Sequence, residues 1–182
     1  MSIRVKLIAA FLFALLAAAT LGFTAFVAAR MLGALTEQMF DGPLQTINFA
    51  RLAQTDFAVI ERTDREFGDS IGKPEMERLH KLVDDFLKDL AVAAERGASE
   101  DISGLAADIR GNVDKWRRAA ESARAGGPAA AAQRTALGTQ IRQDLEVLTQ
   151  IAADNGFVFR EDAGETIEHT RNAIVIVIAL AA

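Results

Sequence analysis

The feature that most constrains this chain is an apolar run, Leu7 to Ala29, that contains no charged residue. A helix rises about 1.5 Å per residue, so a run of this length can span a hydrocarbon core of about 30 Å. In lipid the backbone amides find no partners except one another, which makes a helix the expected conformation. A cleaved signal peptide is the alternative, but its apolar region typically has only about 7–15 residues.

Basic residues flank this run unequally, since Arg4 and Lys6 precede it and Arg30 alone follows it. This excess favours a cytoplasmic N-terminus. The sequence therefore predicts a cytoplasmic stub at residues 1–6 and a transmembrane helix at residues 7–30.

A second apolar run, Ala173 to Ala182, ends the chain. It is too short to cross a bilayer as a helix, which needs about 20 residues. A short core helix is one interpretation. Because the run is uncharged, rich in β-branched residues and without a cap, we expect it to begin a truncated second transmembrane helix at residues 172–182.

The region between the two apolar runs is acidic. All 25 Asp and Glu of the chain and all but three of its 20 Lys and Arg lie between Arg30 and Asn172. This balance argues against nucleic acid as a partner. The absence of cysteine suits an exported compartment, although it suits others too.

No pattern for catalysis, a metal or a cofactor is found in the sequence. There is no glycine-rich phosphate loop and no nucleophile elbow. His80 and His169 lie on separate predicted helices without a second ligand at metal spacing, so we interpret each as a solvated or packing residue. We therefore expect a protein that is not an enzyme.

The acidic region has the apolar periodicity of an all-α domain. We expect four helices, interrupted at Gly68–Ser70, Gly97 and Gly126–Pro128, with Ser99 as the N-cap of the third. Apolar residues recur at steps of three and four in the last three helices. These stripes are Met76, Leu79, Val83, Phe86, Leu90 and Ala93; then Ile102, Leu105, Ile109, Val113, Trp116, Ala120 and Ala123; then Leu137, Ile141, Leu145, Leu148 and Ala152.

Short connections make successive helices antiparallel neighbours. We therefore predict an up-down-up-down four-helix bundle at residues 31–171, with helices 1 and 4 continuous with the transmembrane helices. Helices 1 and 4 are the longest, so the turn between helices 2 and 3 should lie at the level of Pro43 and Gly156. We expect Pro43 to kink or interrupt helix 1, and we expect Gly42, Pro43 and Gly156 to form a hinge. Phe157 and Phe159 should pack near Gly156.

The first helix of this domain has two distinct faces when it is plotted at about 100° per residue. The predicted core face consists of Phe49, Leu52, Ala53, Val59, Ile60 and Phe67. The opposite face consists of Phe40, Leu44, Ile47, Arg51, Thr55, Ala58, Arg62 and Arg65. A single core needs only one apolar face, so the second face suggests a partner, most simply a second copy of this helix.

The basic part of the second face could bind an anion. Guanidinium groups bind carboxylates bidentately, so Arg51, Arg62 and Arg65, with Thr55, form a candidate ligand-binding site at a dimer interface. The alternative is a solvated basic stripe, balanced by Glu61, Asp64 and Glu66. Asp56 falls on the predicted core face, so either it pairs with a residue such as Arg110 or Arg142, or the assumed rotation of the helix is wrong.

The stretch Gly42-Pro43-Leu44, followed by Ala50-Arg51-Leu52-Ala53 and Asp56-Phe57, resembles the first sensor helix of bacterial methyl-accepting chemotaxis receptors and related transmembrane sensors. The chain resembles the N-terminal sensor half of these receptors, namely the first transmembrane helix and a periplasmic four-helix-bundle domain. The resemblance implies an inner-membrane protein that senses signals in the periplasm with residues 31–171.

The resemblance further implies a homodimer that meets through its first sensor helices. Arginines of that helix hold the ligand in amino-acid-sensing members, but the arginine spacing here departs from theirs. A small anionic ligand and a periplasmic binding protein are both possible partners. Signalling would occur by a small displacement of helix 4 relative to helix 1, passed to an output domain beyond Ala182. A histidine kinase or nucleotide cyclase sensor and a ligand-free membrane-anchored scaffold are the alternatives.

Overall fold

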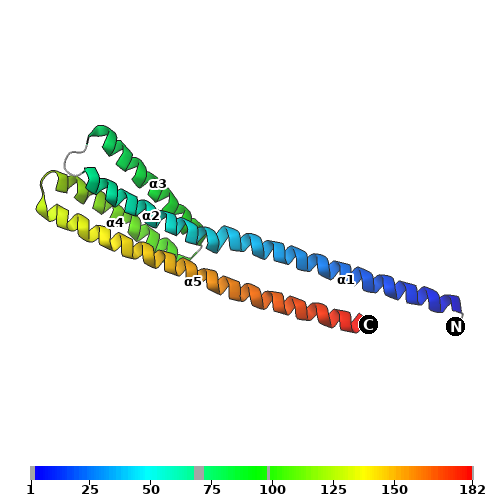
Figure 1. Ribbon diagram of the computed structural model, residues 1–182. Coiled ribbons are helices and arrows are strands. Elements are labelled where there is room, and N and C mark those ends of the chain that lie inside the picture. Colours follow the sequence, from blue (N-terminus) through cyan, green and yellow to red (C-terminus); the bar gives the residue numbers. More distant parts are fainter. Residues whose placement is uncertain (1–2, 68–71, 98, 182) are drawn as a thin grey trace. The chain divides into compact units, whose positions relative to one another are not determined.

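The computed structural model describes residues 3–67, 72–97 and 99–181, and every secondary-structure element in these ranges is helical (Figure 1). The all-α prediction is therefore confirmed. The predicted interruption at Gly68–Ser70 lies outside the described residues. The elements in chain order are α1 (Ile3–Met39), the π-helical turn η1 (Phe40–Leu44), α2 (Gln45–Phe67), α3 (Lys73–Gly97), α4 (Glu100–Arg124) and α5 (Pro128–Ala181).

Local signals in the sequence set several of these boundaries. Ser99 is the N-cap of α4, and its Oγ accepts a hydrogen bond from the Ile102 amide at 3.2 Å, as predicted. Gly126 has a φ of 90°, a left-handed conformation that glycine adopts without steric cost, and it lies between α4 and α5. Pro128 opens α5, where its missing amide hydrogen costs nothing.

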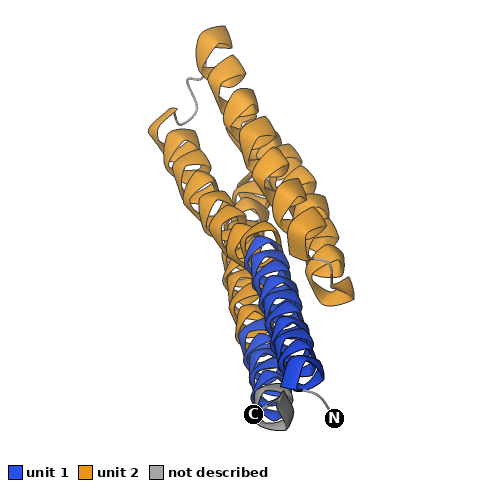
Figure 2. Cartoon of the chain, turned by 90° about the vertical axis from the view of Figure 1, so that its right-hand side faces the viewer, with its two compact units in different colours: residues 1–39, 158–182 blue, residues 40–157 orange. Residues whose placement is uncertain are grey.

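The chain divides into two compact units (Figure 2). One consists of residues Phe40–Phe157 and contains η1, α2, α3, α4 and the N-terminal part of α5. The other consists of Met1–Met39 and Val158–Ala182, and so contains α1 and the C-terminal part of α5. We call them the core unit and the stem unit.

A single hydrophobic core holds the four helical segments of the core unit together. At its centre the ring of Phe57 lies 5.8 Å from the rings of both Phe86 and Trp116. The stripes predicted for α3, α4 and α5 are confirmed, because most of their members are buried and the remainder are partly exposed. The core members from these three helices are Leu79, Val83, Phe86, Leu90, Ala93, Ile102, Ala106, Ile109, Val113, Trp116, Ile141, Leu145, Leu148 and Ala152.

The core face of α2 differs from the prediction. Leu52 and Val59 were expected in the core, but they are 41% and 40% exposed. The buried positions step by four and three residues instead, and they are Thr46, Ala50, Ala53, Phe57, Ile60 and Asp64, with Thr63 beside them. The predicted rotation of the helix was therefore wrong, by less than the angle between successive residues, which is about 100°.

Two further packing predictions need correction. Phe157 is 70% exposed and does not pack in the core. Ile47 was assigned to the outward face, but it packs partly against the core. Phe159 is only partly exposed.

Pro43 does not interrupt the helix, because it lies inside the five-residue π-helical turn η1. A proline ring in an α-helix clashes with the carbonyl four residues earlier, and the wider π turn relieves that clash. The Thr46 hydroxyl donates to the Gly42 carbonyl at 2.9 Å, which satisfies one acceptor of the widened turn. The prediction of a local irregularity at Pro43 is thus confirmed, but its form is a wide turn rather than a break.

By length and composition, one helical stretch among the described residues is long and apolar enough to cross a membrane. It is Ile3–Phe67, and the mean hydropathy of its most apolar 18-residue window is 2.3. None of that window is buried against the rest of the described chain. A signal sequence near the N-terminus satisfies the same criteria of length and composition.

Candidate functional site

The four predicted ligand-binding residues, Arg51, Thr55, Arg62 and Arg65, are all exposed on α2. At about 100° per residue they fall within an arc of about 80°, on the side of the helix away from its buried residues. The structure therefore brings them onto one outward face, as predicted. We call this row of four residues the arginine stripe.

Hydrogen bonds within α2 order part of the arginine stripe. Arg62 Nε lies 2.7 Å from Glu66 Oε1, and this bond raises the pKa of Arg62. Arg65 Nε donates to the Glu61 carbonyl at 3.2 Å, and the Thr55 hydroxyl donates to the Arg51 carbonyl at 3.0 Å. An exposed ion pair such as Arg62–Glu66 is weak, so a carboxylate ligand could displace Glu66 at little cost.

Apolar side chains continue the outward face of α2 toward and beside η1. Phe40 and Leu44, both in η1, are 62% and 40% exposed. Leu52 and Val59, which the prediction placed in the core, flank the stripe instead. Large apolar side chains that stay exposed in a row are typical of a surface that a partner covers.

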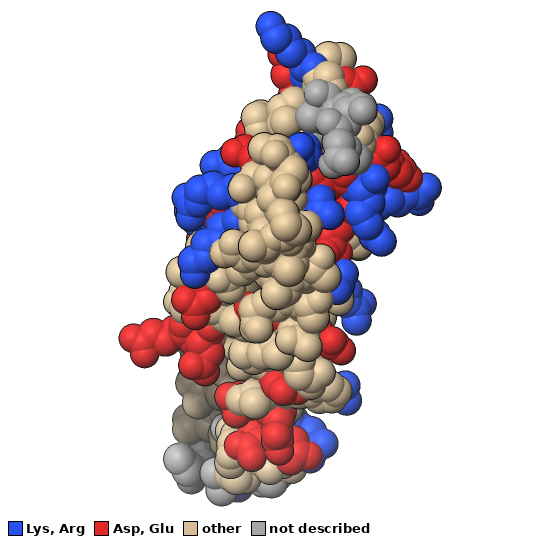
Figure 3. Space-filling view, turned by 90° about the vertical axis from the view of Figure 1, so that its left-hand side faces the viewer, with Lys and Arg blue, Asp and Glu red and all other residues tan. Residues whose placement is uncertain are grey.

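The charges on one face of the molecule are mixed in sign. On the face shown in Figure 3, acidic and basic side chains are interspersed around uncharged surface. Mixed charges of this kind are typical of a solvated helical surface.

The predicted hinge residues lie close together in the core unit. A Cβ placed on Gly156 would lie 3.5 Å from Pro43 Cβ and 3.7 Å from Ile47 Cδ1. A Cβ on Gly42 would lie 3.9 Å from the carbonyl oxygen of Arg96, near the end of α3. Gly156 of α5, the proline-containing turn and the end of α3 therefore lie at the same level, and a Cβ at position 156 would make only ordinary van der Waals contacts there.

Sequence reasoning missed a group of ion pairs between helices that includes one buried carboxylate, Asp64. Asp64 is 2% exposed, and its carboxylate binds Arg124 of α4 and Arg134 of α5, the latter at 3.0 Å. Arg142 Nη1 lies 2.7 Å from Glu61 Oε2. Gly138 leaves the room that the Glu61 carboxylate occupies. We call these five charged residues, Glu61, Asp64, Arg124, Arg134 and Arg142, the ion cluster.

The ion cluster overturns two interpretations from the sequence. The interpretation of the arginine stripe as a solvated basic stripe makes Glu61 and Asp64 its counter-charges, but they bind arginines of other helices. Arg142 was a candidate partner of Asp56, but it binds Glu61. The remaining alternative, a wrong rotation of the helix, is the one that the structure supports.

Asp56 lies beside carboxylates of α3 rather than beside a cation. Its pKa is raised, first by burial and then by a hydrogen bond with Asp89 and the charges of Asp89 and Asp85. Lys88 binds Asp85 at 3.1 Å and so offsets part of that negative charge. The structure thus places three acidic side chains at the contact of α2 and α3.

Replacing Asp56 with asparagine is expected to stabilise the core unit at pH 7 but not below about pH 3.9, the usual pKa of aspartate. An acid whose folded-state pKa is raised adds stability below its unfolded-state pKa and loses it as the pH rises. Urea unfolding at both pH values, followed by Trp116 fluorescence, measures the difference. Asp108→Asn, at an exposed carboxylate, is the control. An equal effect of Asp56→Asn at both pH values would contradict the prediction.

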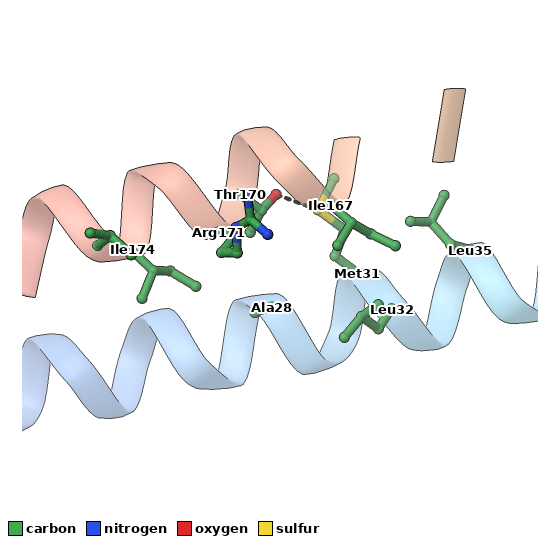
Figure 4. A pocket seen from close by; sticks show the side chains of 9 residues that line it. Ala28, Met31, Leu32, Leu35, Ile167, Thr170, Arg171 and Ile174 are labelled. Carbon is green, nitrogen blue, oxygen red and sulfur yellow. Dashed lines mark hydrogen bonds between the residues drawn. The ribbon is translucent and has the colours of Figure 1, made fainter. Parts of the chain in front are cut away.

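The stem unit contains an apolar groove between α1 and α5 (Figure 4). Its volume is about 220 Å³. The Thr170 hydroxyl points across it and donates to Met31 Sδ at 3.5 Å. The other lining residues are Ala28, Leu32, Leu35, Ile167, Arg171, Ile174 and Val175.

Within residues 3–67, 72–97 and 99–181, no group of three or more His, Asp or Glu is arranged to hold a metal ion. His80 and His169 are both exposed, on α3 and α5. The acidic side chains at Asp56 lack the convergent geometry of a cation site.

Comparisons with protein-family models, with curated proteins and with solved structures returned no match to this chain. The resemblance to chemotaxis receptors therefore depends on architecture and on the short motifs of α2. Four features of the structure bear on function: the apolar helix, the outward face of α2, the hinge residues and the ion cluster.

Proposed function

We propose that this chain is the sensing half of a bacterial transmembrane receptor of the chemoreceptor type. In this proposal α1 crosses the inner membrane at residues 7–30 with its N-terminus in the cytoplasm. Residues 31–171 form the periplasmic sensor domain, and α5 leads into a second transmembrane helix and on to a cytoplasmic output domain. The fully exposed apolar window of α1 supports the membrane assignment.

We propose that the sensor domain is an up-down-up-down four-helix bundle. Contacts between α2 and α5 support the antiparallel arrangement of this pair. Pro43 in η1 lies near Gly156 of α5, whereas Glu61 and Asp64, farther along in α2, bind Arg142 and Arg134. The residue number on α5 therefore falls as the residue number on α2 rises. The shared core of α2, α3, α4 and α5 is also typical of a bundle.

The observation that carries the proposed function is the outward face of α2. One helix carries an arginine stripe and four exposed large apolar side chains on the sides away from its core. We propose that a second copy of α2 covers this face across a two-fold axis, because an isologous contact needs one self-complementary surface. The arginine stripe would then bind a small anionic ligand between the two copies.

Oxidative cross-linking tests the dimer, because the natural chain contains no cysteine. Thr55→Cys and Ala58→Cys each place one thiol on the outward face of α2, and Ala107→Cys places one at an exposed position of α4. In isolated bacterial membranes we expect the two α2 variants to form a disulfide-linked dimer after oxidation, and Ala107→Cys to remain monomeric. Equal cross-linking of all three, or of none, would contradict a dimer through α2.

A further inference from the structure

The contacts between α2 and α5 differ in kind at their two ends. At one end, Glu61 and Asp64 bind Arg142 and Arg134. At the other end, Gly156 faces Pro43 and Ile47, so that a Cβ added to Gly156 would lie 3.5 Å from Pro43 Cβ and 3.7 Å from Ile47 Cδ1. We call the second set the glycine contact.

The ion cluster resists sliding of α5 along α2. Sliding by one helical turn, about 5.4 Å, would separate each carboxylate from its guanidinium group. The side chains of Asp64 on α2 and Arg134 on α5 are 2% and 27% exposed, and a largely buried charge that loses a partner is unfavourable. Arg124 of α4 binds the same carboxylate, so Asp64 of α2 links both α4 and α5 to α2.

The glycine contact offers no such resistance. It involves only apolar atoms, so small movements of α5 there break no hydrogen bond or ion pair. Pro43 also lies in a π-helical turn, where the backbone lacks one amide donor. Arg142 and Gly156 are 14 residues apart on one continuous helix, about 21 Å, so a small rotation at the ion cluster becomes a larger displacement at Gly156.

We infer that the ion cluster is a fixed pivot, about which α5 swings relative to α2 at the glycine contact instead of sliding along it. If the proposed sensor function holds, this swing is the movement that the receptor transmits. The pivot itself depends only on contacts within residues 40–157. Ligand-driven sliding, which the family resemblance allows, would require the ion cluster to break.

Spin-label distances test the pivot in the full chain, reconstituted in lipid nanodiscs. Glu66→Cys with Ala136→Cys labels the end of the ion cluster, and Asn48→Cys with Asp154→Cys labels the end of the glycine contact. All four positions are exposed. Dilution with unlabelled chain restricts the measurement to distances within one chain. We expect the distance distribution at the glycine contact to be roughly twofold broader than that at the ion cluster.

A variant without the bonds from α5 to α2 completes the test. Glu61→Gln, Arg134→Gln and Arg142→Gln together remove these bonds but keep the buried Asp64–Arg124 pair, so the fold is retained. We expect the distribution at the ion cluster to broaden roughly twofold in this triple variant.

The matched control is Asp114→Asn with Arg117→Gln, which removes an ion pair within α4 and should change neither distribution. Equal widths at both ends of the natural chain, or no broadening in the triple variant, would overturn the pivot. Either result would leave the cross-linking test of the sensor dimer unaffected, because that test detects contacts between chains.

Discussion

Replacing Asp64 with alanine is expected to destabilise the core unit by about 3–5 kcal/mol, the usual cost of breaking a buried ion pair by removing one partner. The Asp64 side chain is 2% exposed, and it is the carboxylate that both Arg124 and Arg134 bind. Its loss leaves one guanidinium group buried and another mostly buried, without their counter-charge. Urea unfolding of the full chain in detergent, followed by the fluorescence of the single tryptophan, Trp116, measures the change.

Two variants test whether the loss of stability comes from the ion cluster or would follow from any substitution in α2. Glu66→Ala breaks only the exposed Arg62–Glu66 pair and should cost no more than about 0.5 kcal/mol. Replacing Asp64, Arg124 and Arg134 together with Leu or Met should recover most of the stability, because apolar residues of similar volume substitute well for a buried ionic group. If Asp64→Ala costs no more than Glu66→Ala, the ion cluster does not hold the helices together.

The ion cluster shows where sequence reasoning reaches its limit. Asp64 is followed 60 residues later by Arg124 and 70 residues later by Arg134, and no local pattern joins them. On a helix rich in Glu, Asp and Arg, the default interpretation of such a residue is a solvated charge. Only the packing of three helices brings these side chains together, so only the structure identifies them.

Helices α3, α4 and α5 were predictable because their core positions carry large apolar side chains. Residues such as Leu79, Phe86 and Trp116 recur at steps of three and four along one face of each helix. Their boundaries followed from Ser99, Gly126 and Pro128, which each have a local conformational reason to begin or end a helix.

Helix α2 was harder to predict because it has apolar residues on two sides. Its true core face includes Ala50 and Ala53, whose small side chains give a weak signal in the sequence. Leu52 and Val59 are larger and shifted the predicted core toward themselves. The outward position of the arginine stripe was nevertheless correct, whereas the partner that would cover it belongs to a second molecule and cannot be derived from one chain.

The observed rotation of α2 places Phe57 in the core and leaves Leu52 exposed. Phe57→Ala is expected to destabilise the core unit by about 3–5 kcal/mol, because it leaves a cavity between Phe86 and Trp116. Phe57 is fully buried, and each aromatic pair adds about 0.5–1.5 kcal/mol beyond the area that it buries.

The matched variant is Leu52→Ala, five residues earlier on the same helix. Because Leu52 is 41% exposed, its replacement should change the free energy of unfolding by no more than about 0.5 kcal/mol. Urea unfolding of both variants under identical conditions measures the contrast, with circular dichroism as the signal because Phe57 contacts the fluorescent Trp116. If Leu52→Ala proves as costly as Phe57→Ala, the rotation of α2 is the one predicted from the sequence, and the apolar side chains that flank the arginine stripe are not free to meet a second copy.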